Sequence, residues 1–352
     1  MQKDFHYYCI AVLARAAGFT EEDALTIAYA SQYVDDAKLH GPLLFGDRKT
    51  HDIRFDPIQT QHSSIRSFSW PVQKLVFMPF HFLPARPFTP PGYTFTYVTE
   101  KNSQFAQFIF SEACNEPNEP LRLCRIGVAA HTLADTWAHR GFSGRLHNEN
   151  GVEKIEGGSR RTFIQFITGL LQGASPKIGH AEALTIPDQS HLTWSYMKKD
   201  SGETSPQRSN ATNLPNLRNN PEDFFESAQA IYDLLLKARK TKSEKPVPWT
   251  DINDKIGSLL EEREDSLNNK CDLWEMGFND LFKKKVYRYE HSQWEVEAFE
   301  SKGFTVTDLG KLSQEDLEQV EFKMKPGFFS SRWYYFHQAA RIHQSLVVPR
   351  LP

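Results

Sequence analysis

Three residues with metal-binding side chains are spaced four apart in the segment GVAAHTLADTWAHRGF: His131, Asp135 and His139. Each step of four residues turns an α-helix about 40° beyond a full turn, so the three side chains would form one stripe and could converge on a cation or cation cluster. Imidazole nitrogen and carboxylate oxygen are ligands that zinc accepts. Because the flanking residues are apolar, the stripe would be buried, and buried polar groups need compensating partners. The pattern therefore favours a metal site over a solvent-facing stripe.

Further histidines and acids stand in unusual settings outside this segment. They are His6 beside Asp4, the consecutive Asp35 and Asp36, His81 within MPFHFLP, and His180 and Asp188 within GHAEALTIPD. Each alone has an ordinary structural explanation, such as a satisfied core histidine or a turn carboxylate. Their order along the chain, taken together with the central stripe, is what indicates function.

The elements that must position these residues are mainly helices. Apolar residues at helical spacing, with start and stop signals, predict an all-α, multi-helix bundle-like domain with few short strands. The predicted helical segments are 4–34 as a hairpin, 102–114, 120–140, 159–172, 221–241, 249–284 with a break, and 331–346. Residues 301–322 resemble a small turn-and-helix insertion.

A long loop, rich in proline and aromatic residues, is predicted for residues 35–92. Repeated prolines in PVQKLVFMPFHFLPARPFTPPG forbid a long helix there. Loops of that length inside a compact domain are more often functional than idle. We therefore expect this loop to fold over the mouth of a polar cavity, where His81 meets the first and central helices at a single buried site.

The chain divides into three predicted regions. Residues 1–195 would form a metal-binding helical core, 196–220 a flexible polar loop, and 221–352 C-terminal helices that pack on the same domain. A length of 352 residues is enough for a substantial core. The oligomeric state is left open.

Composition excludes several classes of protein. Lys and Arg total 41 against 44 Asp and Glu, a net charge of −3, so no extended nucleic-acid surface is expected. No apolar stretch reaches transmembrane length, and the amino terminus offers no convincing signal-peptidase site, so we expect a cytoplasmic, unprocessed protein. The 4 cysteines are scattered without a C-x-x-C pair, which suggests buried free thiols.

The order of these residues resembles the zinc-dependent phospholipase C and single-strand-specific nuclease superfamily, all-helical enzymes with three clustered zinc ions. The segments YASQYVDDA, PFHFLP and AAHTLADTWAHRGF look especially like a bacterial branch of it. The resemblance covers roughly residues 1–195. It implies a zinc-dependent hydrolase of phosphoric esters, with two or three Zn²⁺ ions or other divalent metals, acting on a small phosphoester or a phospholipid.

The resemblance also implies roles for single residues. One metal would be held by Asp35 or Asp36 with His81, His131 and Asp135, a second by His139, His180 and Asp188, and a third by His6 with Asp135 bridging. His131 and Asp135 would be the catalytic residues. The family uses a processed amino-terminal Trp as a ligand, whereas this chain begins Met1-Gln2, so either Asp4 substitutes or the third metal is bound more weakly. Independently of the resemblance, Arg140 or Arg145, adjacent to the central helix, is the candidate for binding the substrate phosphate, with Arg140 preferred.

Two other readings stay open. The His51-Asp52 pair resembles that of HD-type phosphohydrolases, although it falls in a predicted loop. A non-catalytic interaction module stabilised by a closed metal cluster would use the same ligands without an open coordination position. The motifs of P-loop, dinucleotide-binding, serine-hydrolase and ordinary zincin proteins are absent. Composition alone does not separate a lipid from a nucleotide substrate.

Overall fold

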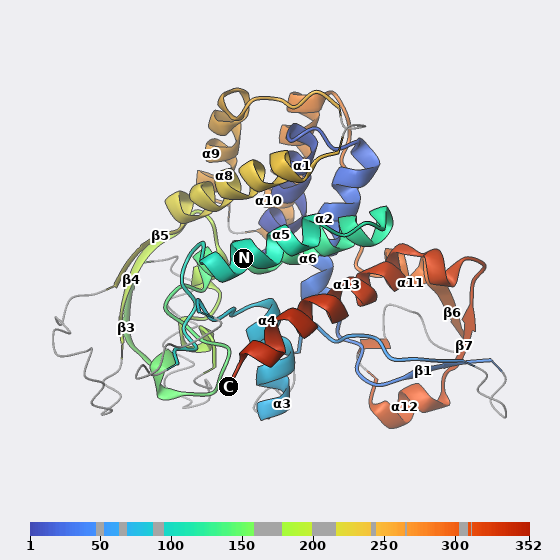
Figure 1. The fold of residues 1–352 in the computed structure, drawn as a ribbon. Coiled ribbons are helices and arrows are strands. Elements are labelled where there is room, and N and C mark those ends of the chain that lie inside the picture. The colour runs from blue at the N-terminus through green and yellow to red at the C-terminus, as the bar shows by residue number, and fades with distance from the viewer. Residues whose placement is uncertain are drawn as a thin grey trace.

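Helix α6 (Glu119–Ala138) runs through the centre of the molecule in the computed structural model (Figure 1). Its side chains are buried along almost the whole length, and it packs against α2, α5, α8 and α13. The helix begins at Asn118, whose side-chain oxygen accepts a hydrogen bond from the Leu121 amide at 3.2 Å, a strong start signal. The structure describes residues 1–46, 53–62, 69–86, 95–157, 178–198, 216–240, 244–264, 266–302, 309–310 and 312–352.

Helix α2 (Glu21–Asp36) lies directly against α6 and brings its C-terminal acids to the middle of that helix. Gly127 makes the close approach possible: a Cβ there would overlap the carbonyl oxygen of Ile27 and the Cβ of Ala30. Only glycine permits two helix backbones to come so near at this point. As a result, Asp35 at the end of α2 faces His131 of α6, 3.9 Å away.

The first helical segment and the C-terminal helices surround this pair. Besides a helical run at residues 70–80, the other helices of the described residues are the π-helix η1 (Asp4–Cys9), α1 (Ile10–Ala16), α5 (Gln104–Cys114), α8 (Asn220–Ala238), α9 (Asn253–Glu261), α10 (Leu267–Phe282), α11 (Gln293–Ala298), α12 (Gln314–Gln319) and α13 (Arg332–Val347). Short 3-10 turns lie at Asn148–Asn150, Ala181–Ala183, Ile186–Asp188, Trp249–Asp251, Phe328–Ser330 and Val348–Arg350. Helix α8 packs on α6 and α1, α10 on η1, and α13 on α6.

The prediction of an all-α fold is wrong, because two small sheets flank the helices and make the fold mixed α and β. Of the described residues, 58% are helical and 11% lie in strands. One sheet has the strand order β2-β1-β7-β6 and the other the order β3-β4-β5, on opposite sides of the helical core (Figure 1). The strands are β1 (Leu43–Phe45), β2 (Ile53–Phe55), β3 (Val152–Gly157), β4 (Thr193–Lys198), β5 (Asn216–Asn219), β6 (Phe299–Lys302) and β7 (Glu321–Met324).

Strand pairing across large sequence distances explains why the sheets were missed. The parallel pairing of β1 with β7 joins Phe45 to Phe322. These strands are only three to six residues long, too short for a period-two pattern to stand out. Both ends of the predicted loop 196–220 also belong to the second sheet, because Lys198 ends β4 and β5 pairs with it from Asn216 to Asn219. Residues 199–215 of that loop lie outside the described residues.

A helical run occupies Trp70–Phe80, where repeated prolines were expected to forbid a long helix. It consists of α3 (Trp70–Val72), the π-helix η3 (Gln73–Phe77) and α4 (Met78–Phe80). Pro71 lies in the first turn, where its missing amide hydrogen costs nothing. Pro79 leaves the carbonyl of Leu75 without its helical donor, and the Gln344 side chain of α13 donates to that carbonyl at 2.7 Å. A tertiary contact therefore offsets the proline.

Other predicted helices agree with the structure to within a few residues. The segments 102–114, 120–140, 221–241 and 331–346 correspond to α5, α6, α8 and α13, and 249–284 contains α9 and α10. The insertion at 301–322 contributes α12 but also the strands β6 and β7. The predicted helix at 159–172 and the His51-Asp52 pair lie outside the described residues.

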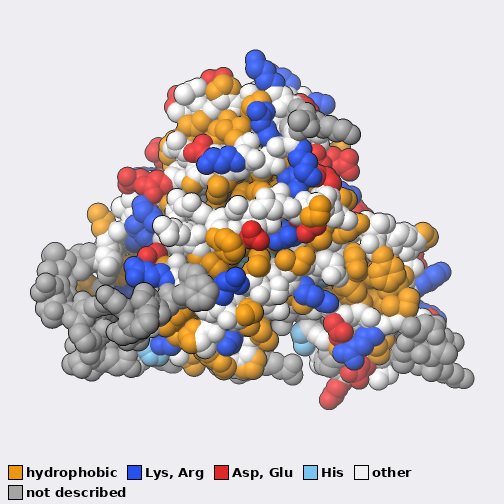
Figure 2. Space-filling view, viewed as in Figure 1, with side chains coloured by type: hydrophobic (Ala, Val, Ile, Leu, Met, Phe, Trp, Pro, Cys, Tyr) orange, Lys and Arg blue, Asp and Glu red, His pale blue; other side chains and the backbone are white. Residues whose placement is uncertain are grey.

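Among the described helices, none combines the length and the apolar character that crossing a bilayer requires. On the face drawn in Figure 2, lysine, arginine and acidic side chains are interspersed among apolar ones, with no continuous basic area on the described part of that face.

Glu295, on α11, provides a test of the packing around α2. Its Oε1 accepts a hydrogen bond from the Tyr33 hydroxyl at 2.5 Å, and burial raises the pKa of Glu295 to about 8. The native state keeps this proton up to about pH 8, whereas the unfolded chain releases it above its ordinary pKa of 4.5. The native state thus binds more protons between these values, and stability falls as the pH rises through this window.

Glu295→Gln should remove most of this fall, which amounts to a few kcal/mol at about 1.4 kcal/mol per pKa unit. Chemical denaturation of both proteins at pH 5 and pH 8 measures it. The matched control is Glu300→Gln at an exposed position of β6. An unchanged pH dependence in Glu295→Gln would show that Glu295 is not the titrating group.

Candidate metal centre

The predicted ligands are delivered to one buried region by six separate segments. They are His6 from η1, Asp35 from the end of α2, His81 at the C-cap of α4, His131, Asp135 and His139 from α6 and its C-cap, and His180 and Asp188 from the turns before β4. The expected meeting of the first helix, the central helix and the His81 segment is confirmed. His131 Nε2 lies 3.2 Å from His81 Nδ1.

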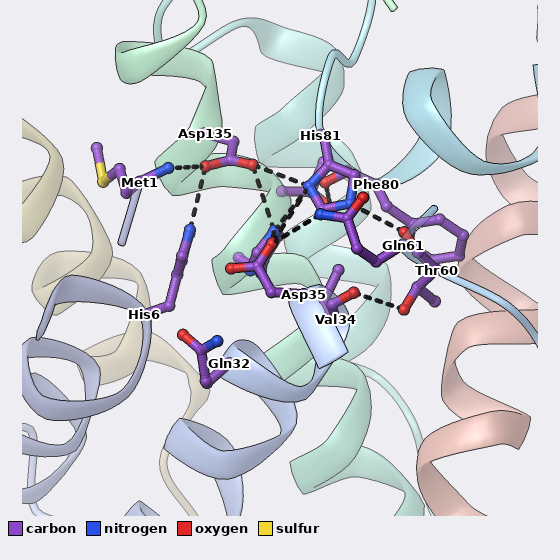
Figure 3. Close-up of polar contacts among 12 residues, drawn as sticks. Met1, His6, Gln32, Val34, Asp35, Thr60, Gln61, Phe80, His81 and Asp135 are labelled. Atoms are coloured by element: carbon purple, nitrogen blue, oxygen red, sulfur yellow. Dashed lines mark hydrogen bonds and ion pairs between the residues drawn. The ribbon is translucent and has the colours of Figure 1, made fainter. Parts of the chain in front are cut away.

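Asp135 lies at the centre of the region (Figure 3). Its Oδ1 is 3.2 Å from His6 Nε2, and its Oδ2 is 3.3 Å from both His81 Nδ1 and His131 Nε2. The carboxylate is only 1% exposed. A buried carboxylate with imidazoles on both oxygens can bridge two cations, because each oxygen can serve a different ion.

Three groups of donors are close enough to share an ion each. They are His6, Asp35 and His131; His81, His131 and Asp135; and His139, His180 and Asp188. Within each group, one donor atom per residue lies within 4.8 Å of the others. The first two groups share His131, and His139 Nδ1 of the third group lies 3.6 Å from Asp135 Oδ2, so the donors form one connected cluster.

The third group continues from the end of α6. His139 Nε2 is 3.1 Å from Asp188 Oδ1, and His180 Nε2 is 3.4 Å from Asp188 Oδ2. The other ring nitrogen of each histidine faces a backbone carbonyl: His139 Nδ1 is 2.7 Å from the oxygen of His81, and His180 Nδ1 is 2.7 Å from that of Leu184. Such contacts fix the ring orientation and leave Nε2 for a ligand, as in many histidine metal sites.

The amino group of Met1 links the groups. Its nitrogen lies 2.7 Å from Asp135 Oδ1 and 3.2 Å from Asp188 Oδ1. Burial lowers the pKa of this amine, but the carboxylates of Asp135, Asp188 and Asp35 outweigh burial and raise it to about 11. In the structure, this ammonium is a cation placed where two carboxylates meet.

The protonation states of four groups suit metal binding, whereas burial raises the pKa of Asp35, and Asp135 and Asp35 raise the pKa of His81 against the effect of burial. Burial alone would raise the pKa of Asp135 and of Asp188, but neighbouring histidines and the Met1 ammonium hold both pKa values well below the ordinary range. Burial lowers the pKa of His6, and it lowers the pKa of His180 to about 4. Ionised carboxylates and neutral imidazoles are the forms that bind metal ions.

Several buried nitrogens in the cluster lack a hydrogen-bond partner among the described residues. They are Nδ1 of His131 and both ring nitrogens of His6, whose Nε2 lies 3.2 Å from Asp135 Oδ1 without forming a hydrogen bond to it. The rings of His6 and His131 are stacked with their centroids 3.8 Å apart. Burying unpaired polar nitrogens is costly, and a metal ion would compensate those that face the cluster. The donor set therefore fits zinc.

Two cavities border residues of the cluster. One of about 270 Å³ is bounded by Met1, Asp35, Asp135 and the third group, with Phe77, Phe82 and Ile178 as an apolar wall. The other, of about 570 Å³, shares Met1 and Asp35 with it and is lined further by side chains of α10 and by the segment around Tyr289. The donors thus border open space that can accommodate a small ligand.

Three predicted site residues lie elsewhere. The carboxylate of Asp4 is buried 3.7 Å from Lys270 Nζ and belongs to none of the three groups, so it does not substitute for an amino-terminal ligand. Asp36 accepts hydrogen bonds from Tyr289 and Gln32, which leaves Asp35 as the acid of α2 that faces the histidines. Arg140 does not line the smaller cavity and is paired with Asp223 at 3.0 Å, so the structure does not place it on a substrate phosphate.

Sequence reasoning missed the Met1 amino group, the backbone carbonyl that faces His81 and the Gln61 side chain that faces Asp35. The carbonyl of Thr60 lies 2.9 Å from His81 Nε2, and Gln61 Nε2 donates to Asp35 Oδ1 at 3.5 Å. Backbone groups carry no residue-type signal. The Thr60 carbonyl could therefore not be recognised as an acceptor from the sequence. The sequence shows only that Thr60 and Gln61 are adjacent polar residues within the predicted loop.

Over residues 1–351, the chain matches the model of a family described as a family of unknown function (DUF6765), and it belongs to that family. No curated protein and no solved structure matches it. The function must therefore be argued from the geometry of the site.

Proposed function

We propose that this protein is a zinc-dependent phosphoesterase that hydrolyses a small phosphomonoester or phosphodiester. The observation that carries the proposal is the connected cluster of three His and Asp groups, buried and yet bordering a cavity. A cluster that served only to stabilise the fold would not need open space beside its donors. Adjacent ions are the usual arrangement for phosphoryl chemistry, because attacking and leaving oxygens each need stabilisation.

The proposed role of each residue follows from its position in the cluster. Asp135 and His131 would hold the central ions, with Asp35, His6 and His81 around them, and His139, His180 and Asp188 would hold the outer one. Bound zinc would supply Lewis acidity and a water activated near neutral pH. The chain itself orients the imidazoles through backbone carbonyls and keeps Asp135 ionised. No separate nucleophilic side chain is required.

The smaller cavity suggests how a substrate is oriented. The ring of Phe82 stacks on His139 at a centroid distance of 4.5 Å, and Phe77 and Ile178 extend the apolar wall. A phosphate at the donors would place its attached group against this wall. The volume of this cavity, about 270 Å³, suits a small attached group and not a long polymer.

Metal content and hydrolysis of a substrate panel test the proposal together. The protein is purified without chelator and without residues added before Met1, because that amino group lies within the cluster. We expect at least two zinc ions per chain by elemental analysis. We also expect hydrolysis of at least one of three substrates: a choline phospholipid, an aryl phosphodiester and a nucleoside monophosphate. Chelation should abolish this activity, and zinc should restore it.

The outcomes separate the alternatives. Fewer than one metal ion per chain, with no uptake of added zinc, would overturn metal dependence itself. Full zinc occupancy without hydrolysis of any member of the panel would overturn the catalytic part of the proposal and favour a closed, metal-stabilised interaction module.

A further inference from the structure

The C-terminal end of α6 is held by cationic side chains from the three-stranded sheet. Arg218, on β5, donates from Nη2 to the carbonyls of Trp137 and Ala138, each at 2.9 Å, and from Nη1 to the carbonyl of Arg140 at 3.2 Å. Lys198, at the end of β4, donates from Nζ to the carbonyl of Gly141 at 2.7 Å. The two cationic side chains thus bind four backbone carbonyls within residues 137–141, across the end of the helix.

These contacts answer a physical need of the helix. The last carbonyls of an α-helix have no amide partner within the helix, and they form the negative end of its dipole. Arg218 is only 2% exposed, and burying a guanidinium is unfavourable unless it is paired. Its partners are these carbonyls and the carboxylate of Asp223, which lies 3.5 Å from its Nε. A guanidinium suits this place because its fork can serve several acceptors at once.

His139 lies among the residues whose carbonyls Arg218 and Lys198 bind at the end of α6. It is the C-cap of α6, with φ −97° and ψ 10°, so its backbone has already left the helical geometry. The direction of its ring depends on how the last turn closes, and that ring must meet Asp188 on one side and the carbonyl of His81 on the other. The other histidine of α6, His131, lies two turns earlier and has no such dependence.

We propose that Arg218 is a positioning residue for the third group of donors, holding the last turn of α6 so that His139 can share an ion with His180 and Asp188. This inference rests on the proposed metal binding of that group. It predicts that losing the Arg218 contacts weakens one ion selectively. The ions of the two groups that share His131 should be retained.

Zinc titration of variants tests the proposal. Arg218→Met removes the donors, and Arg218→Lys keeps the charge but can reach fewer carbonyls. The control is Arg122→Met: Arg122 is also buried, and its Nη1 donates at 2.8 Å to the carbonyl of Ala238, the last residue of α8. Competition between Zn²⁺ and a chelator gives the affinity of each ion, and thermal unfolding of the metal-free proteins reports folding.

We expect Arg218→Met to bind one ion about 10- to 100-fold more weakly, the range usual for residues that orient ligands, with the others unchanged. Arg218→Lys should fall between it and wild type. Arg122→Met should lose stability but keep wild-type zinc affinities. If Arg218→Met does not fold, the comparison of Arg218→Lys with Arg122→Met carries the test.

Three results would overturn the inference. The first is that every ion binds the Arg218 variants as tightly as wild type. The second is that all ions weaken together, and the third is that Arg122→Met weakens the same ion; either of these would indicate general destabilisation. Failure of the wild-type protein to bind zinc is a separate result, and it would overturn the proposed function from which this inference starts.

Discussion

Asp135→Asn should lower hydrolysis by about three orders of magnitude, the largest loss expected from a single substitution. The amide keeps the shape but loses the charge, and one oxygen becomes a nitrogen that cannot bind a cation. Asp135 contacts the Met1 amine and histidines on both of its oxygens, so no other side chain can replace it. Metal-bound charge stabilisation supplies several kcal/mol, and each 1.36 kcal/mol is a factor of about ten in rate.

Zinc content and activity are measured on the same preparation, beside Asp280→Asn as the matched control. Asp280 is exposed on α10 and pairs only with Lys255 among the described residues, so its substitution should leave both quantities at wild-type levels. Asp135→Asn should also lose zinc. Wild-type zinc content together with wild-type hydrolysis in Asp135→Asn would show that the cluster is not the catalytic centre.

Zinc should raise the melting temperature of the metal-free protein by on the order of 5–10 °C. A ligand that binds only the native state adds about 2.7 kcal/mol of stability per site when present at 100 times its dissociation constant. Three groups are available, and both ring nitrogens of His6 and Nδ1 of His131 lack a hydrogen-bond partner among the described residues. Each kcal/mol raises the melting temperature by about 2–4 °C in domains of 150–250 residues and by less in a longer chain.

Thermal unfolding at a series of zinc concentrations measures this effect. Magnesium at the same concentrations is the control, since it prefers oxygen ligands in octahedral geometry and should stabilise little. Asp188→Asn should retain part of the zinc effect, because it removes a donor from only one group. An equal gain with magnesium, or none with zinc, would mean that the three groups are not a zinc centre.

Local periodicity was the most reliable guide to the site. The spacing of His131, Asp135 and His139 depends only on helix geometry, and α6 carries all but the last of them within its regular turns. The order of Asp35, His81 and His6 along the chain indicated three segments that the structure brings together beside Asp135 and His131. It could not say which of Asp35 and Asp36 faces inward, because that depends on where α2 crosses α6 at Gly127.

The errors share one cause, which is that long-range contacts decided the outcome. Asp4 is close in sequence to His6, but the geometry of η1 carries its carboxylate to Lys270 instead of the cluster. The helical run through Pro79 is stabilised by Gln344, from a helix more than 260 residues away. Arg218 stood in a polar tract predicted to be a loop, and only the unpaired carbonyls at the end of α6 make its burial favourable.

The sequence by itself determined most of the described helices and the central stripe of candidate donors, because residue type and spacing along a helix are local properties. Only the tertiary structure decided which donors meet. It placed the Met1 amino group between two carboxylates, divided the donors into three groups and added the sheet that clamps the end of α6. Those arrangements depend on backbone groups and on packing between distant segments, and neither leaves a signal in the order of side chains.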